Sequence, residues 1–258
     1  GVGIQAGGSM YRLQVAGRGG VPANADSVML NIAAVDPQGF GYLTVYPCDS
    51  RPLAASLNFS PSVTISNGLL AKLSPGDGAV CIYTSQATHL VVDVNGYVPS
   101  GGDPYAVNPA RLVDTRPGAI TVDGNDAGLG LVFPGRVLQF SARGRGGVSS
   151  DAESVFLNVA ATEAYGAGYL TVYPCGSRPN AASLNYTAGV DIANGIVTKL
   201  NTGGDFCIYS STFTHVVVDV VGYVPQGGSL DTVNPARLMD TRPSPLGDTV
   251  DGSYVGAG

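Results

Sequence analysis

The stretch SVMLNIAAVDPQGFGYLTVYPC, residues 27–48, occurs again with few changes as SVFLNVAATEAYGAGYLTVYPC at residues 154–175. Apolar and β-branched residues form short runs within it, and Gly, Pro and Asp separate these runs. Runs of this length without a 3.6-residue apolar stripe predict strands joined by turns. The match continues on both sides, so the 258-residue chain contains one unit twice, with the period of a tandem domain rather than of a short solenoid repeat.

Each copy holds about seven strand-like runs in roughly 110 residues, a density typical of antiparallel sandwiches. We therefore predict an all-β fold of two tandem antiparallel β-sandwich modules, Ig-like or jelly-roll-like, at residues 1–107 and 108–233. Residues 234–258 form a separate C-terminal docking segment that repeats the start of the second module. A chain of this length can bury a sizeable core.

Four cysteines occupy matching positions, Cys48 and Cys81 in the first copy and Cys175 and Cys207 in the second. We predict one disulfide within each module, with reduced core cysteines as the alternative. A metal site is not expected, because CxxC is absent and each copy has one His. Paired disulfides indicate an oxidising compartment, so we expect a secreted, extracellular or cell-surface protein.

Charge and hydropathy exclude two classes of partner. The net charge is -6 with a sequence pI near 4.7, whereas nucleic-acid binding requires clustered Lys and Arg. No apolar run reaches the roughly 18 residues of a membrane span, so we expect no membrane partner and no cofactor. The chain begins with Gly1 rather than Met, which suggests a mature or excised segment.

Two carboxylates lie within Val-rich runs and need a cation if they are buried. Asp93 lies in HLVVDVNGYV and Asp219 in HVVVDVVGYV. The phrase NPARLVDTRPG at 108–118 returns as NPARLMDTRPS at 234–244 and supplies arginines in both copies. Strand alternation predicts Leu112, Asp114 and Arg116 on one face and Arg111, Val113 and Thr115 on the other. We predict that Arg116 or Arg111 forms a bidentate pair with a sandwich carboxylate. The candidate ion-pair residues are Asp93, Asp219, Arg111, Arg116, Arg237, Arg242, Asp114 and Asp240.

Catalytic chemistry has little support. His89 with Asp93, and His215 with Asp219, stand four residues apart, which on a strand is about 13 Å and too far for a dyad. No nucleophile elbow accompanies them. We therefore expect no enzymatic activity.

Tyrosines offer an alternative, because aromatic faces beside Asn and Asp can stack on sugars. They can equally be core or sheet-face residues with their hydroxyls at the rim. Asn58 and Asn185 lie in glycosylation sequons, and the sequence alone does not decide whether they carry a glycan. The candidate glycan platform consists of Tyr42, Tyr46, Tyr97, Tyr169, Tyr173 and Tyr223.

Taken together, PARLVDTR, GYLTVYP, ASLNY and THVVVDVVGYV resemble a repeat of secreted, surface-associated proteins of actinobacteria and some neighbouring phyla. The resemblance covers nearly the whole chain twice and implies an extracellular β-rich module, used singly or in tandem. It carries over no catalytic or ligand residue. In that family the P-x-R-L-x-D-T-R phrase usually opens a unit and the D-V-x-G-Y strand closes it, whereas here the last opening phrase comes near the end of the chain.

The copy of this phrase at residues 234–244 has several interpretations. It can be the last strand of the preceding module, fold back in cis, form one junction of a longer covalent array, or complete the first module of the next molecule by strand addition. We favour the last, and predict an extracellular structural protein that assembles with itself into a fibre, stalk or surface layer. The alternative is a glycan-binding module of a cell-wall-associated protein. The candidate assembly residues are Asn234, Arg237, Leu238, Asp240 and Arg242.

Overall fold

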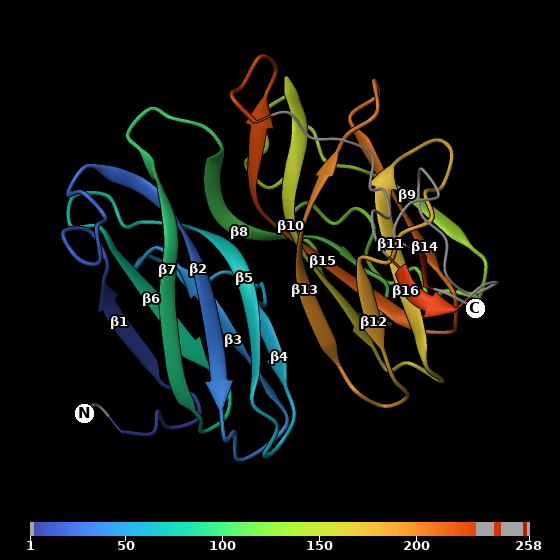
Figure 1. Ribbon diagram of the computed structural model, residues 1–258, viewed down its shortest axis with the longest axis horizontal. Coiled ribbons are helices and arrows are strands. Elements are labelled where there is room, and N and C mark those ends of the chain that lie inside the picture. The colour runs from blue at the N-terminus through green and yellow to red at the C-terminus, as the bar shows by residue number, and fades with distance from the viewer. Residues whose placement is uncertain (1–2, 231–239, 244–254, 257–258) are drawn as a thin grey trace.

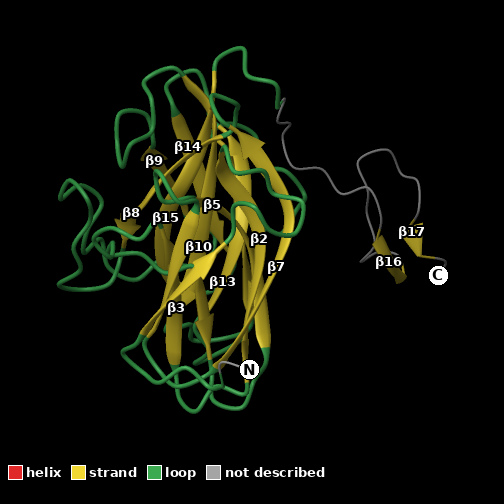
Figure 2. Cartoon of the chain, turned by 90° about the vertical axis from the view of Figure 1, so that its left-hand side faces the viewer, coloured by secondary structure: helices red, strands yellow, loops and turns green. Residues whose placement is uncertain are grey.

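The computed structural model describes residues 3–230, 240–243 and 255–256, and every regular element in this part of the chain is a β-strand (Figure 1). Figure 2 shows the strands of the two sandwiches running along the long direction of the molecule. No helix among the described residues is long and apolar enough to cross a membrane. The predicted all-β fold of two sandwiches is confirmed.

The first sandwich pairs the sheet β1-β6-β3-β4 with the sheet β5-β2-β7. All pairings within these sheets are antiparallel. Its strands are β1 (Met10–Gln14), β2 (Ala25–Val35), β3 (Gly41–Tyr46), β4 (Leu57–Phe59), β5 (Ile65–Lys72), β6 (Ala79–Thr84) and β7 (His89–Pro99).

The second sandwich repeats this arrangement with one more strand. Its sheets are β12-β11-β14-β9 and β13-β10-β15-β8, so β8 occupies a position beside β15. Its strands are β8 (Tyr105–Asp114), β9 (Val137–Ser141), β10 (Ala152–Thr162), β11 (Gly168–Pro174), β12 (Leu184–Tyr186), β13 (Ile192–Lys199), β14 (Asp205–Ser210) and β15 (His215–Pro225). Two short strands, β16 (Asp240–Pro243) and β17 (Val255–Gly256), pair with each other beyond it.

Alternation along the strands produces the two cores. In β2, Val28, Leu30 and Ile32 are buried, and Met29 on the opposite face is 45% exposed. Burying each of these apolar side chains contributes about 2 kcal/mol to the stability of the fold. In β10 almost every residue is buried, because the inner face packs in the second core and the outer face lies against the first sandwich.

The open position in the first sandwich is the main difference between the two copies. Strand β15 pairs with β10 on one side and with β8 on the other. Strand β7 pairs with β2, and among the described residues no strand pairs with its other side. The segment 100–104 links β7 to β8, and β8 belongs to the second sandwich from Tyr105 onward.

Each sandwich contains its predicted disulfide, Cys48–Cys81 in the first and Cys175–Cys207 in the second. Each bond joins the end of the GYLTVYPC segment to the neighbouring strand β6 or β14. No cysteine of the chain is left as a free thiol. The two disulfides indicate an oxidising environment.

Removing either disulfide is expected to lower the free energy of unfolding by about 3 to 4 kcal/mol, because each bond closes a loop of 33 or 32 residues. The double variants Cys48→Ser/Cys81→Ser and Cys175→Ser/Cys207→Ser serve as matched partners in denaturant unfolding. A loss below about 1 kcal/mol in both would contradict this expectation.

Candidate functional site

A network of side-chain and backbone hydrogen bonds joins the two sandwiches where they meet. The edge strand β5 and the loop before β4 lie against the outer face of β10, β13 and β15. Asn67 donates a hydrogen bond from Nδ2 to Asn158 Oδ1 at 2.8 Å and accepts one at Oδ1 from the Gly195 amide at 2.8 Å. Both asparagine side chains are buried, so these bonds fix how the sandwiches meet.

The backbone of Ala55 completes this polar network. Its carbonyl accepts a hydrogen bond from Asn158 Nδ2, and its amide donates one to Asp219 Oδ2 at 2.8 Å. An apolar cluster continues the contact beyond the polar atoms. It joins Leu70 and Val98 of the first sandwich to Phe156, Val221 and Val224 of the second.

Asp219 is the anchor of a buried ionic cluster. Arg111 on β8 donates to it through Nε at 2.9 Å and through Nη2 at 3.2 Å, which is a bidentate pair. Arg111 Nη1 also contacts Asp114 Oδ2 at 3.2 Å, and Arg116 Nη2 contacts the same oxygen at 2.6 Å. Asp219 and Asp114 are each 1% exposed. The cluster therefore ties strand β8 to β15 and, through Ala55, to the first sandwich.

The predicted alternation along β8 is wrong. Arg111 and Asp114 were expected on opposite faces, yet they contact each other. Asp219 pairs with Arg111 and Val217 with Asp114, so β8 contains one more residue than β15 between these positions. Such a β-bulge shifts the side-chain alternation by one and places both charged residues on the same face.

Burial and pairing act on these groups in opposite directions. Complete burial raises the pKa of the Asp219 carboxyl, and the Arg111 guanidinium and the Ala55 amide oppose this rise. Burial alone would also raise the pKa of Asp114, but the hydrogen bonds from Arg116 and the charges of both arginines bring it below its ordinary value. Burial works against the charge of Arg111, and Asp219 and Asp114 more than compensate, so its pKa is raised. The guanidinium stays charged at every physiological pH.

A second charged anchor holds the segment that follows β8. Arg145 donates through Nε to Asp123 Oδ2 at 2.7 Å and through Nη1 to Asp126 Oδ2 at 2.8 Å. Its Nη2 reaches the Leu112 carbonyl at 2.8 Å. Gly146 next to it allows close approach, because a Cβ there would lie within 3.2 Å of Ala110 and Leu112. One arginine therefore holds both β8 and the loop after it.

Lowering the pH is expected to remove the contribution of Asp123 to the free energy of unfolding. The Arg145 hydrogen bonds lower the Asp123 pKa, so its stabilisation is present above the ordinary carboxyl pKa of about 3.9 and is lost as the pH falls through the depressed value. We expect Asp123→Asn to cost about 1 kcal/mol at pH 6. Unfolding at a series of pH values should show this difference shrinking below about pH 3.5, and a pH-independent difference would contradict the pairing.

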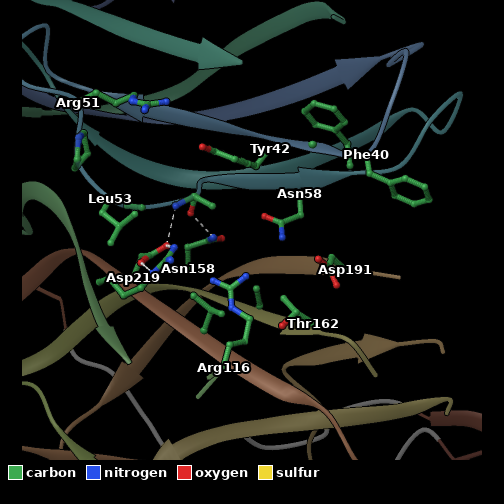
Figure 3. Close-up of a pocket in the computed structure, with 18 residues that line it drawn as sticks. Phe40, Tyr42, Arg51, Leu53, Asn58, Arg116, Asn158, Thr162, Asp191 and Asp219 are labelled. Atoms are coloured by element: carbon green, nitrogen blue, oxygen red, sulfur yellow. Dashed lines mark hydrogen bonds and ion pairs between the residues drawn. The ribbon is translucent and has the colours of Figure 1, made fainter. Parts of the chain in front are cut away.

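A cavity of about 440 Å³ opens beside the ionic cluster, between the two sandwiches. In Figure 3, Arg116 points into it from the second sandwich, and Tyr42 and Asn58 face it from the first. The Asn58 Oδ1 atom is buried without a hydrogen-bond partner. A wall of aromatic and amide groups with one unsatisfied acceptor can bind a small polar ligand. The polar and aromatic lining residues are Phe40, Tyr42, Arg51, Asn58, Phe59, Arg111, Arg116, Asn158, Thr162, Asp191 and Asp219.

The first sandwich lacks the counterpart of the ionic cluster in the described residues. Asp93, which corresponds to Asp219, is exposed and forms no ion pair there, contrary to the prediction that it contacts an arginine. The reason is that, in the described ranges, no strand pairs with the side of β7 opposite β2, so none brings a guanidinium there or excludes water. Arg18, the counterpart of Arg145, is likewise exposed and donates to the Gln14 carbonyl.

The predicted tyrosine platform is not assembled. In the first sandwich Tyr42 lies on β3 and Tyr97 on β7, which belong to opposite sheets. Tyr46 and Tyr173 are buried. In the second sandwich Tyr169 packs near Tyr209, and Tyr223 stacks on Tyr105. The alternation within GYLTVY could not show that the DVxGY strand lies in the other sheet.

The histidines do not join the aspartates four residues away. His215 is buried and its Nδ1 lies 3.1 Å from Thr115 Oγ1, whereas His89 is exposed. No group of three or more His, Cys, Asp or Glu side chains suited to a metal occurs in the described ranges. Of the predicted assembly residues, Asn234, Arg237 and Leu238 lie outside these ranges, and so do the side chains of Asp240 and Arg242 in β16.

Asn67 and Asn158 are the residues that sequence analysis missed. Each is an amide side chain in the middle part of a strand, and each has a counterpart, Asn194 and Asn31, in the other copy. An amide repeated at the same strand position in both copies is the signal that could have found them, because such a group must be hydrogen-bonded when buried. No family model and no curated protein matches the chain.

Proposed function

We propose that this protein is an extracellular structural protein whose sandwich modules join end to end. In the proposed assembly, the C-terminal segment 234–258 of one molecule adds a strand beside β7 of the next, as β8 does beside β15. The observation that carries the proposal is the unpaired side of β7 in the described chain. An exposed strand edge offers backbone groups to an added strand.

Charge supports the same pairing. The segment 108–128 brings Arg111 to Asp219 and Asp123 to Arg145. The matching positions in the first sandwich, Asp93 and Arg18, have no ion-pair partner in the described ranges. The C-terminal segment has an arginine in NPARLMDTR, Arg237, and an acid in TVDG, Asp251, at the corresponding places. Each unpaired charge therefore has a partner of opposite sign in the segment.

The position of the unpaired edge of β7 favours strand addition between molecules over addition within one molecule. In the sheet β5-β2-β7, strand β5 is the edge that contacts β8, β13 and β15. Strand β7 is the opposite edge and reaches the second sandwich at Val98, near its end. Figure 1 shows β7 on the side of the first sandwich away from β10 and β13. A contact between two different surfaces does not close on itself as a two-fold dimer does, so it propagates into a filament wherever the rotation from one molecule to the next does not close a ring. The disulfides agree with a location outside the cytoplasm.

Electron microscopy and sedimentation of the full chain test this function. We expect filaments or end-to-end oligomers whose mass rises with protein concentration. A chain that stays monomeric at every concentration tested would overturn the proposal.

Glycan binding is the second candidate, and the cavity beside Arg116 is the observation that favours it. We expect a cell-wall oligosaccharide to bind there with Tyr42 at its wall, and Tyr42→Ala to weaken binding about fivefold, as loss of an aromatic contact does. Tyr97→Ala is the matched control, because Tyr97 does not line the cavity. Calorimetry with wall fragments measures the difference, and equal affinities for both variants would exclude this site.

A further inference from the structure

A cavity of about 450 Å³ lies where the linker of residues 100–104 leaves the first sandwich. We call it the linker cavity. None of the described residues that line it also lines the cavity beside Arg116, so it is a separate site. Its wall includes Ala25, Ser27, Lys72 and Pro104.

The second sandwich has a matching cavity that contains an arginine side chain, and we call it the Arg143 cavity. Arg143 donates through Nε to the Ala152 carbonyl at 2.8 Å and through Nη1 to the Thr202 carbonyl at 3.0 Å. The two cavities are lined by residues at the same places in the two copies. The matching pairs include Asp26 and Glu153, Lys72 and Lys199, and Ser100 and Gln226.

The main difference between the two cavities is the arginine itself. The first sandwich has Ala16 where the second has Arg143. Both side chains pass the same glycine, because a Cβ at Gly78 would meet the Ala16 Cβ and a Cβ at Gly204 would meet the Arg143 side chain. The linker cavity is therefore a cavity of the same design without a guanidinium group of its own.

The backbone that holds the guanidinium is repeated in the first sandwich. Ala25 is the counterpart of Ala152 and lines the linker cavity. Ala25 pairs with Pro99 and Ala152 pairs with Pro225, each next to a register shift at the same place in the strand. The Ala25 carbonyl is thus placed to accept a hydrogen bond from a guanidinium, as the Ala152 carbonyl does.

The wall of the linker cavity offers a second polar group and a negative charge. Ser27 is 1% exposed, and its Oγ has no hydrogen-bond partner among the described residues. A buried hydroxyl without a partner is costly, so a bound donor is favoured there. Asp26 also lines the cavity and attracts a cation, whereas Lys72 opposes it. Lys199 lines the other cavity beside Arg143, so a lysine at this position is compatible with a guanidinium.

We propose that the linker cavity binds the guanidinium group of an arginine side chain presented by another molecule. The group takes the place that Arg143 fills in the second sandwich and donates to the Ala25 carbonyl. Asn24 stands where the second sandwich has Asp151, so the cavity carries one negative charge fewer and the binding is weak. This site is independent of the proposed strand addition, because it uses neither the C-terminal segment nor the edge of β7.

Ligand-observed NMR with the full chain tests the site, since this method detects weak binding to a large particle as well as to a monomer. The probe is Nα-acetyl-arginine amide. Nα-acetyl-citrulline amide is the matched control, because citrulline has the shape of arginine without its charge. We expect the arginine probe to bind about tenfold more tightly than the citrulline probe. Equal binding of the two, or no binding of either, would overturn the proposal.

Ala16→Arg tests where the probe binds. The substitution gives the linker cavity a guanidinium of its own, so the affinity for the arginine probe should fall about tenfold while the unfolding midpoint is kept. Ser9→Arg is the matched control. It adds the same charge and also copies the second sandwich, which has Arg136 at this position, but Ser9 does not line the cavity. Equal affinities of the two variants would place the probe elsewhere and overturn the site.

Sedimentation of the same two variants identifies the source of the arginine. If a second copy of this chain presents it, Ala16→Arg should weaken self-association and Ser9→Arg should not. If a separate peptide presents it, the two variants should associate equally. Either result supports the site once Ala16→Arg has lost the probe.

Arg143→Ala is the reciprocal variant, and it tests the proposal even if Ala16→Arg does not fold. Alanine is the residue that the first sandwich has at this position, so the second sandwich should keep its fold. The substitution removes the guanidinium from the Arg143 cavity and leaves its acceptors in place. The chain then offers two cavities, and the amount of arginine probe bound below saturation should about double. No gain in binding would show that such a cavity does not take a guanidinium from solution, and would overturn the proposal.

Discussion

Replacing Asp219 with Asn is expected to lower the free energy of unfolding by about 3 to 5 kcal/mol, because it leaves the buried Arg111 without its main partner. Asn has one oxygen in place of two, so it cannot keep both the bidentate contact with Arg111 and the acceptor for the Ala55 amide. Asp114 remains beside Arg111 but is shared with Arg116. Chemical denaturation at pH 7 measures the loss.

Asp93→Asn is the matched control, since Asp93 occupies the same position in the first sandwich. It is exposed and has no ion pair within the described ranges, so its substitution should change the stability of the isolated molecule by less than about 0.5 kcal/mol. The comparison therefore measures the effect of burial at one sequence position. A loss below about 1 kcal/mol for Asp219→Asn, or an equal loss for both variants, would refute this account of the cluster.

The sequence repeat predicts the sandwich fold and both disulfides, because these depend on interactions inside one module. Apolar alternation and turn residues act over a few positions, and each cysteine pair closes a loop within its own copy. The position of β8 depends on a bulge opposite Asp219. Nothing in the phrase RLVDTR indicates that β8 will contain one residue more than the facing part of β15. The alternation predicted for this strand was wrong for that reason.

The environment of the aspartates could not be predicted because nearly identical strands have different surroundings. THLVVDVNGYVP and THVVVDVVGYVP both read as buried strands, yet β7 is exposed on alternate residues and β15 is buried along most of its length. What buries β15 is β8 on one side and the first sandwich on its outer face. Asn95 in place of Val221 is the one polar substitution that marks the uncovered face.

Deleting residues 234–258 is expected to abolish assembly while the remaining chain stays folded. The two described cores and both disulfides lie before this segment, so the unfolding midpoint should not change. In the proposed filament the deletion removes the strand that pairs with β7, together with Arg237 and Asp251. Sedimentation should find monomers where the full chain forms filaments. Filaments of unchanged length from the truncated chain would refute strand addition.

Charge reversal then decides whether the segment acts within a molecule or between molecules. Asp93→Arg damages the site beside β7 and keeps the segment, and Arg237→Asp does the reverse. Neither variant should assemble alone, because like charges would meet at each junction. An equimolar mixture restores opposite charges at both kinds of junction. The segment of the Asp93→Arg chain meets the native β7 edge of the Arg237→Asp chain, and the two substituted positions also carry opposite charges. The mixture should therefore form filaments in which the two chains alternate. Docking in cis predicts no assembly on mixing and a loss of stability in each variant by itself, so sedimentation and unfolding of the three samples separate the two arrangements.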